Sequence, residues 1–182
     1  PILPVQILWI NMTTAVLLGL MLVFEPKEPD IMDRPPRDPQ EPILTRVLVW
    51  RLILVGLLLL LGAFGLFARE LRTGVGIAEA RTVAVNCFVM VELFYLFNCR
   101  SLTKSAFEVG FFSNPWVFGG AGIMIVLQLL FTYLPAMNAM FHSHPIGLDS
   151  WLRILGVATV ALLGVGAEKR FVRWWTARAA GR

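Results

Sequence analysis

The 182-residue sequence contains few charged side chains. Only 15% of its residues are Asp, Glu, Lys or Arg, whereas a typical soluble domain has about 25%. Hydrophobic residues make up 57% of the chain, and the mean hydropathy is +0.72. The charges are too few to coat a soluble globule, and the apolar residues are too many for one core. This composition excludes a soluble, disordered or collagen-like chain and indicates an integral membrane protein.

Cysteine and catalytic motifs are also scarce. Only Cys87 and Cys99 occur, and the composition excludes a disulfide-stapled secreted domain. Because the two cysteines lie beyond disulfide reach on one predicted helix, they report nothing on the redox compartment. The sequence contains no Walker sequence, no glycine-rich phosphate loop and no Ser/His/Asp arrangement. His142 and His144 form a pair without a third metal ligand. We therefore expect no catalytic residue, no bound cofactor and no nucleotide hydrolysis within this chain.

Long apolar runs, by contrast, are abundant. A helix needs roughly 20 mostly apolar residues to cross about 30 Å of hydrocarbon, and five runs approach that length. Glu92 is the one charge well inside a run, and Arg153 stands near the end of another. The sequence predicts an all-α fold, a polytopic membrane helix bundle with five transmembrane helices at about residues 3–24, 52–68, 82–97, 115–134 and 151–167.

Basic residues are distributed unevenly between the two sides of the membrane. Most of the 16 Lys and Arg residues fall in the segments 25–51, 98–114 and 168–182. The positive-inside rule makes these segments cytoplasmic, including the C-terminus, so we expect a multi-pass protein of the plasma (inner) membrane. Five spans then put the start of the chain outside, which predicts at least one further span upstream. Because the cations lie at the ends of apolar runs, they indicate the lipid bilayer as partner and no nucleic acid.

The first apolar run has polar side chains in its middle. Asn11 and Thr14 are three residues apart and share a helix face, with Ala15 beside them. Amide and hydroxyl groups in lipid need partners, so this face should point into the bundle. Two functions remain open from the residues alone. They are hydrogen bonds that hold helices together, and oxygen ligation of a hard cation.

Glu92 is a second polar position inside a predicted span. A lone carboxylate in the middle of a membrane costs at least about 2–3 kcal/mol unless it is paired, protonated or hydrated. Intramembrane carboxylates are therefore candidates for ion or proton pathways. The alternative is a structural Glu92 that is hydrogen-bonded to another helix.

The segment 25–46 is predicted to be a cytoplasmic proline-rich loop. Its first part, EPKEPDIMDRPPRDPQEP, mixes acidic with basic residues and has six prolines. Proline excludes helix and sheet and favours a stiff, extended segment. Such a segment suits a docking strut between the membrane and a cytoplasmic domain, and a simple linker is the alternative.

Several stretches resemble the P-type cation-transporting ATPases, in particular their calcium-pump-like P2 branch. They are LPVQILWINMTTA with the following FEPKEPDIMDRPPR, and further on VELFYLFNCRS and SNPWV. A W-x-N-x-x-T helix followed by a D-I-M-x-R-P-P-R loop is a specific combination, and the resemblance covers essentially the whole chain. It implies that the five spans are the sixth to tenth helices of a ten-helix pump. It also implies a parent that uses Mg-ATP to transport a cation, calcium or another.

The resemblance implies functional residues at a few positions. In calcium-pump relatives the sixth helix binds ions through Asn, Thr and Asp oxygens. Asn11 and Thr14 match the first two, whereas Ala15 stands where the Asp would be. Glu92 matches the acidic residue of the eighth helix. The missing carboxylate favours one ion per cycle or a monovalent ion.

The same resemblance implies a partner. The loop residues that match the segment in contact with the phosphorylation domain of relatives are Asp30, Asp33, Arg34 and Arg37. We therefore expect the chain to bind the rest of a pump, whose phosphorylation and nucleotide domains lie outside it. On its own the chain should not be an enzyme. The alternative function is a freestanding five-helix membrane accessory or scaffold protein.

Overall fold

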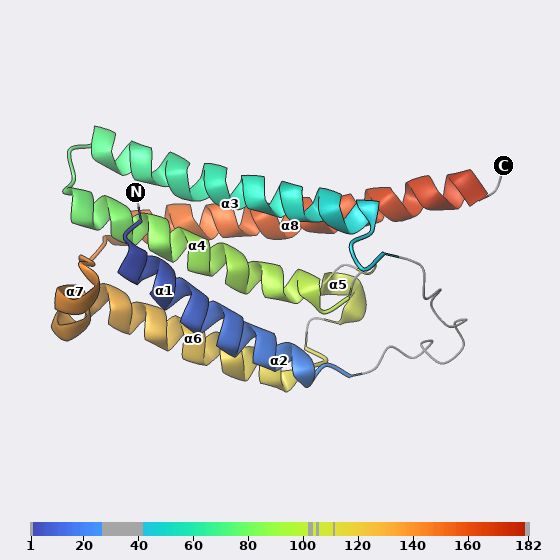
Figure 1. The fold of residues 1–182 in the computed structure, drawn as a ribbon, viewed down its shortest axis with the longest axis horizontal. Helices are drawn as coiled ribbons and strands as arrows, with labels where there is room; N and C mark the ends of the chain where they lie inside the picture. The colour runs from blue at the N-terminus through green and yellow to red at the C-terminus, as the bar shows by residue number, and fades with distance from the viewer. Residues whose placement is uncertain (1, 27–41, 102–103, 105, 111, 181–182) are drawn as a thin grey trace.

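The computed structural model describes residues 2–26, 42–101, 104, 106–110 and 112–180. The regular structure in this part of the chain is helical, and the long helices lie side by side (Figure 1). The elements in chain order are α1 (Pro4–Thr13), the π-helix η1 (Thr14–Leu18), α2 (Gly19–Val23), α3 (Arg46–Arg72), α4 (Ile77–Cys99), α5 (Ala106–Val109), α6 (Pro115–Tyr133), α7 (Pro135–Phe141) and α8 (Leu148–Ala180).

Five helices in the described ranges are long and apolar enough to cross a membrane. This confirms the predicted all-α membrane bundle and its number of spans. The first span is continuous over Pro4–Val23, through α1, η1 and α2. Helices α3 and α8 are longer than the apolar runs 52–68 and 151–167. At the ends of α3 and α8 the helix continues through charged and aromatic residues. These residues limit the apolar stretch that is visible in the sequence, but they do not interrupt the helical hydrogen bonds.

Local sequence explains where several helices begin. Helices α1, α6 and α7 each have proline in their first turn, where its missing N–H and fixed φ do no harm. The Thr45 hydroxyl accepts from the Leu48 N–H at 3.3 Å and caps α3. The Asn114 side chain accepts from the Trp116 N–H at 3.0 Å and caps α6. Each cap satisfies an N–H group that has no partner within its own helix.

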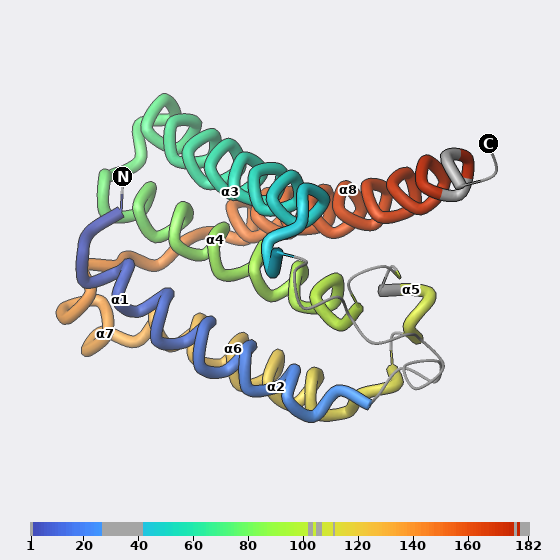
Figure 2. Tube along the Cα trace, turned by 45° about the vertical axis from the view of Figure 1, so that its right-hand side comes forward, coloured from blue at the N-terminus to red at the C-terminus, as the bar shows by residue number. Residues whose placement is uncertain are grey.

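Helix α4 is the centre of the bundle. Figure 2 shows α3 and α8 on one side of α4, and the first span with α6 on the other. In its apolar stretch 67% of the residues are buried, against 17% in α3 and 28% in α8. Helix α4 contacts α1, η1, α3, α6 and α8. Its fully buried side chains include Val83, Val85, Val89 and Val91.

Two glycines allow close packing between spans. A Cβ atom on Gly62 of α3 would lie 2.6 Å from Cγ1 of Val157 in α8. A Cβ atom on Gly120 of α6 would lie 2.2 Å from Cγ of Met21 in α2. Small residues let helix backbones approach one another, which is how helices in lipid gain packing energy.

Several polar side chains inside the spans hold helices together. The Gln6 amide donates to the Phe141 carbonyl at 3.0 Å, and the Asn86 amide donates to the Thr132 hydroxyl at 3.0 Å. These bonds join the first span to α7 and α4 to α6. Each satisfies a polar group that lipid could not.

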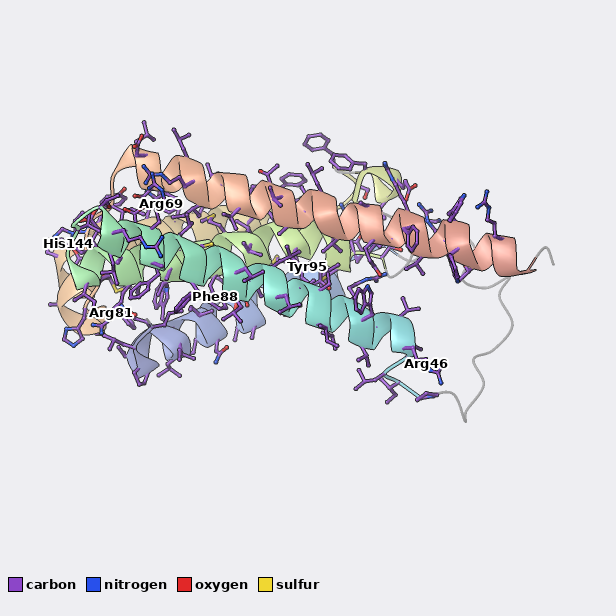
Figure 3. The ribbon with its side chains drawn as sticks, turned by 90° about the horizontal axis from the view of Figure 1, so that it is seen from above. Arg46, Arg69, Arg81, Phe88, Tyr95 and His144 are labelled. Carbon is purple, nitrogen blue, oxygen red and sulfur yellow. The ribbon has the colours of Figure 1, made fainter. Side chains whose placement is uncertain are left out.

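One end of the bundle, called here the tail end, is marked by Arg46 in Figure 3. Here the Arg51 guanidinium of α3 lies 2.9 Å from the Glu168 carboxylate of α8, and both side chains are buried. Glu25, which follows α2, lies 2.8 Å from an Arg100 guanidinium nitrogen. The helices are therefore joined at this end by charge-assisted hydrogen bonds.

The opposite end carries Arg69, Arg81 and His144 (Figure 3). The Arg153 guanidinium of α8 lies 2.9 Å from the Glu70 carboxylate of α3, so an ion pair joins α3 to α8 at this end too. The proposed docking residues Asp30, Asp33, Arg34 and Arg37 lie outside the described residues.

Candidate functional site

The first span changes its helix type in the middle. Helix α1 passes into the π-helix Thr14–Leu18 and then into α2. The Thr13 hydroxyl donates to the Trp9 carbonyl at 2.7 Å, and the Thr14 hydroxyl donates to the Ile10 carbonyl at 2.8 Å. A hydrogen bond from a Thr hydroxyl to the carbonyl four residues earlier competes with the backbone hydrogen bonds of a regular α-helix. Single π-helical turns within α-helices occur frequently at functional sites. The helical hydrogen-bond pattern thus changes at Thr14, one of the polar residues singled out in the sequence.

A depression of ≈ 300 Å³ lies between this part of the first span and α4. Asn11, Thr14 and Glu92 all line it, so the structure brings together the three residues assigned to cation binding. Its other lining residues are Ala15, Leu18, Gly19, Leu22, Tyr95, Leu96 and Cys99. Two helices that are distant in sequence therefore build one site.

Glu92 is the anionic group of the depression. Its Oε2 atom is buried and has no hydrogen-bond partner among the described residues. The Thr14 side chain lies within hydrogen-bonding reach of the Glu92 carboxyl, but the Thr14 proton is already directed to the Ile10 carbonyl. The depression therefore has in its lining a carboxylate oxygen without a donor among the described residues, and carboxylate oxygens are ligands that suit a hard cation.

The neutral oxygens come from the first span. The Asn11 side chain is exposed, whereas Thr14 is buried, so the depression is open at Asn11 and closed at Thr14. Ala15 contributes a methyl group and no charge. The described residues hold no group of three His, Cys, Asp or Glu side chains placed to bind a metal ion.

A cation in this depression would have one carboxylate and two neutral side chains as ligands. Hard cations such as calcium take about 6–8 oxygen ligands. The depression is therefore one part of a coordination sphere, and further oxygens have to come from water or from elements beyond the described residues.

The sequence analysis did not single out two lining residues that carry a hydroxyl or thiol group, Tyr95 and Cys99. They follow Glu92 by three and seven residues, a spacing that puts them on its helix face, so helical periodicity could have found them. Figure 3 shows Tyr95 on the half of α4 nearer the tail end. The depression therefore extends from Glu92 toward that end of the bundle.

Comparison with known proteins identifies the family of the chain. Residues 1–171 match the family described as "Cation transporting ATPase, C-terminus". The chain is 56% identical over 168 residues to the "Probable cation-transporting ATPase F" of Mycobacterium tuberculosis, covering 92% of this chain and 19% of that protein.

More distant relatives carry similar names. The chain is 31% identical over 173 residues to "Calcium-transporting ATPase 1" of Yarrowia lipolytica (95% of this chain, 19% of that protein). It is 31% identical over 164 residues to the "Calcium-transporting ATPase" of Bacillus subtilis (88% and 18%). The chain thus spans about a fifth of the length of the curated relatives it matches. It belongs to the cation-transporting ATPase family and corresponds to the C-terminal membrane region of these pumps.

Proposed function

We propose that this chain lines part of the transport path of an ATP-driven cation pump, and that Asn11, Thr14 and Glu92 contact the transported cation. The observation that carries the proposal is the depression in which these residues meet, with a buried Glu92 oxygen that has no partner among the described residues. Gln6 and Asn86, which link helices elsewhere in the bundle, are paired.

The three residues would have different roles. The Glu92 carboxylate supplies the negative charge, and its oxygens replace part of the hydration shell of the cation. The Asn11 and Thr14 oxygens supply neutral ligands on the opposite wall. Because Ala15 adds no charge, this part of the site suits a single calcium ion or a monovalent cation.

The rest of the pump would supply what this chain lacks. The concentration of basic residues in the segments 25–51, 98–114 and 168–182 supports a cytoplasmic tail end and C-terminus in the plasma (inner) membrane. On that side, Asp30, Asp33, Arg34 and Arg37 would dock the cytoplasmic domains that bind Mg-ATP and become phosphorylated.

The test is ion-dependent phosphoenzyme formation by the whole protein that contains this chain. Membranes are screened with calcium, sodium, potassium, manganese and magnesium, using wild type, Glu92→Gln, Asn11→Ala and Thr14→Ala. Thr159→Ala is the matched control, because its hydroxyl also donates at 2.8 Å to its own helix but lies outside the depression.

We expect one ion to drive phosphorylation and Glu92→Gln to lower its apparent affinity by at least about tenfold, a loss typical of damage to a metal site. Thr159→Ala should match the wild type. If Glu92→Gln, Asn11→Ala and Thr14→Ala all respond to every ion as the wild type does, these three side chains are links between helices and the proposal fails.

A further inference from the structure

The cation depression has two walls that approach the tail end separately. The wall from the first span ends with Gly19 and Leu22, and the wall from α4 ends with Leu96 and Cys99. Helix α6 contacts both α2 and α4, and Figure 2 shows it beside α2. The two walls and α6 therefore form a triangle at this end of the bundle, with the depression between the walls.

Two sides of this triangle are made by aromatic contacts with α6. Phe24, at the end of the first span, stacks on Trp116 with ring centroids 5.1 Å apart. Phe97 of α4 packs against Phe118 with centroids 5.8 Å apart. Aromatic contacts of this kind tolerate offset and tilted geometries. They hold each wall to α6, but a direct link between the walls is needed to fix the third side.

That link is the ion pair between Glu25 and Arg100. Glu25 follows the wall residue Leu22 by three positions, and Arg100 directly follows the wall residue Cys99. The Arg100 Nε atom lies 3.0 Å from each Glu25 carboxylate oxygen, and its Nη2 atom lies 2.8 Å from Oε1. The Arg100 side chain is 0% exposed and that of Glu25 is 16% exposed. The ends of both walls are therefore joined by a buried pair.

Further hydrogen bonds fix the orientation of both charged groups. The Asn114 amide donates to Glu25 Oε2 at 2.8 Å, while its own oxygen caps α6. Arg100 also donates to the Gly110 carbonyl at 3.1 Å and to the Ser113 hydroxyl. A planar guanidinium that binds several acceptors has one geometry available to it. We call Glu25, Arg100 and Asn114 the Glu25 bracket.

We infer that the Glu25 bracket sets the spacing of the two walls and thereby positions the cation ligands, so that Glu25 and Arg100 are positioning residues that do not touch the cation. The inference rests on the proposed function, because it concerns the same depression. Glu92 and Arg100 are eight residues apart on α4, a rise of about 12 Å. A shift of the bracket therefore tilts the wall that carries Glu92 relative to the wall that carries Thr14.

The other end of the first span is held independently. There Gln6 donates to the Phe141 carbonyl at 3.0 Å, and the Trp9 indole donates to the Gln128 side chain at 3.3 Å. Loss of the bracket would therefore free one end of the span while the other stays attached. Metal–oxygen distances are narrow, about 2.3–2.6 Å even for calcium, so a small tilt is enough to weaken binding.

The bundle contains a matched ion pair that joins helices away from the depression. Glu70 accepts from Arg153 at 2.9 Å, and the Glu70 side chain is 5% exposed. This pair joins α3 to α8 at the end opposite the tail end, and neither residue lines the depression. Its loss removes a buried pair of the same chemistry without acting on either wall.

The test compares Glu25→Gln with Glu70→Gln in the whole protein that contains this chain. Melting temperature in detergent and the ion dependence of phosphoenzyme formation are measured on the same preparations. We expect both variants to melt below the wild type. Only Glu25→Gln should lower the apparent cation affinity, by about two- to thirtyfold, the range for residues that act on a site without touching it.

A milder pair of variants guards against misfolding. Arg100→Lys keeps the positive charge beside Glu25 but loses the planar fork, and Arg153→Lys makes the same change at the opposite end. We expect Arg100→Lys to lower the cation affinity less than Glu25→Gln does, and Arg153→Lys to match the wild type.

The spacing itself is measured without any ion, through the thiol of Cys99. Cys99 is exposed and lines the depression, and Glu25 lies on the opposite wall. The protein is treated with N-ethylmaleimide, and modification of Cys99 is followed by peptide mass spectrometry. We expect Cys99 to react faster in Glu25→Gln than in the wild type or in Glu70→Gln, because the walls are no longer held together.

The outcomes separate this inference from the proposed function. If Glu92→Gln lowers the cation affinity and Glu25→Gln does not, the inference fails and the proposed function stands. If Glu92→Gln also leaves every ion response unchanged, both fail. An equal loss of affinity in Glu70→Gln would assign the effect to stability and overturn the inference. Unchanged reactivity of Cys99 in Glu25→Gln would overturn it too, because the bracket would then not set the spacing.

Discussion

Two kinds of carboxylate stand in this bundle, and they differ in what surrounds them. Near the ends, Glu25, Glu70 and Glu168 each lie 2.8–2.9 Å from an arginine nitrogen. Near the middle of α4, Glu92 has a buried oxygen without a partner among the described residues. The paired groups connect two helices, whereas the unpaired one lines a depression. The comparison separates carboxylates that stabilise the fold from one that is available to a ligand.

The largest expected loss of stability comes from removing the arginine partner of a paired carboxylate. Arg51→Met leaves Glu168 buried without its partner, and removing one member of a buried pair typically costs about 3–5 kcal/mol of the free energy of unfolding. Thermal melting of the detergent-solubilised whole protein measures the loss. The double variant Arg51→Met/Glu168→Met should recover most of the stability, because no charge is left buried. A single variant that melts like the wild type would show that this pair does not hold α3 to α8.

Packing between the same two helices gives a smaller effect. Gly62→Ala places a methyl group 2.6 Å from Val157 Cγ1, and overpacking of this kind costs about 1–3 kcal/mol. Gly65→Ala on the same helix meets no atom within 4 Å. It should be neutral or stabilising by up to about 1 kcal/mol, the difference in helix propensity. Melting temperatures of the two variants test this order, and equal values would contradict the close approach of α3 to α8.

Glu92→Gln should affect stability much less than the loss of an ion-pair partner does. We expect the free energy of unfolding to change by less than about 1 kcal/mol, because no ion pair within the described chain is lost. The ion dependence of phosphoenzyme formation should change strongly. The two readouts are melting temperature and ion titration on the same preparation. A loss of stability as large as that of Arg51→Met would make Glu92 a structural residue and remove the contrast on which the site assignment rests.

The smallest change in stability is expected for the threonine pair. Thr14 and Thr159 donate the same 2.8 Å bond to their own helices, so each alanine variant loses one equivalent hydrogen bond. At the exposed Thr159 the free energy of unfolding should change by less than about 0.5 kcal/mol. Only Thr14→Ala should lower the apparent ion affinity. Equal ion affinities would limit the cation contacts of this chain to Asn11 and Glu92.

The helices could be predicted because an apolar run of sufficient length is visible without knowing its neighbours. The ends of α3 and α8 could not, because hydropathy falls at charged residues such as Arg51 while the helix continues. The π-helix Thr14–Leu18 was also beyond prediction. Its sequence, TAVLL, is compatible with an ordinary α-helix, and Thr14 alone suggests a local irregularity.

The candidate site was predictable in part. Polar residues within apolar runs pointed to Asn11, Thr14 and Glu92, and the resemblance to cation pumps agreed. Gln6 is also a polar residue within the first apolar run, and its amide instead donates to the Phe141 carbonyl. Polarity alone cannot separate these two outcomes, since both begin with a group that lipid cannot satisfy.

The sequence by itself determined the membrane class, the five spans and the family, because these depend on composition, run length and motifs along the chain. Only the tertiary structure decided which polar groups meet. Gln6 and Phe141 are 135 residues apart, and Asn11 and Glu92 meet across two spans. Which of these residues, far apart in the sequence, come together is set by how the helices pack around α4. Packing leaves Glu168 beside an arginine. It leaves Glu92 in the lining of a depression, with a buried oxygen that has no partner among the described residues.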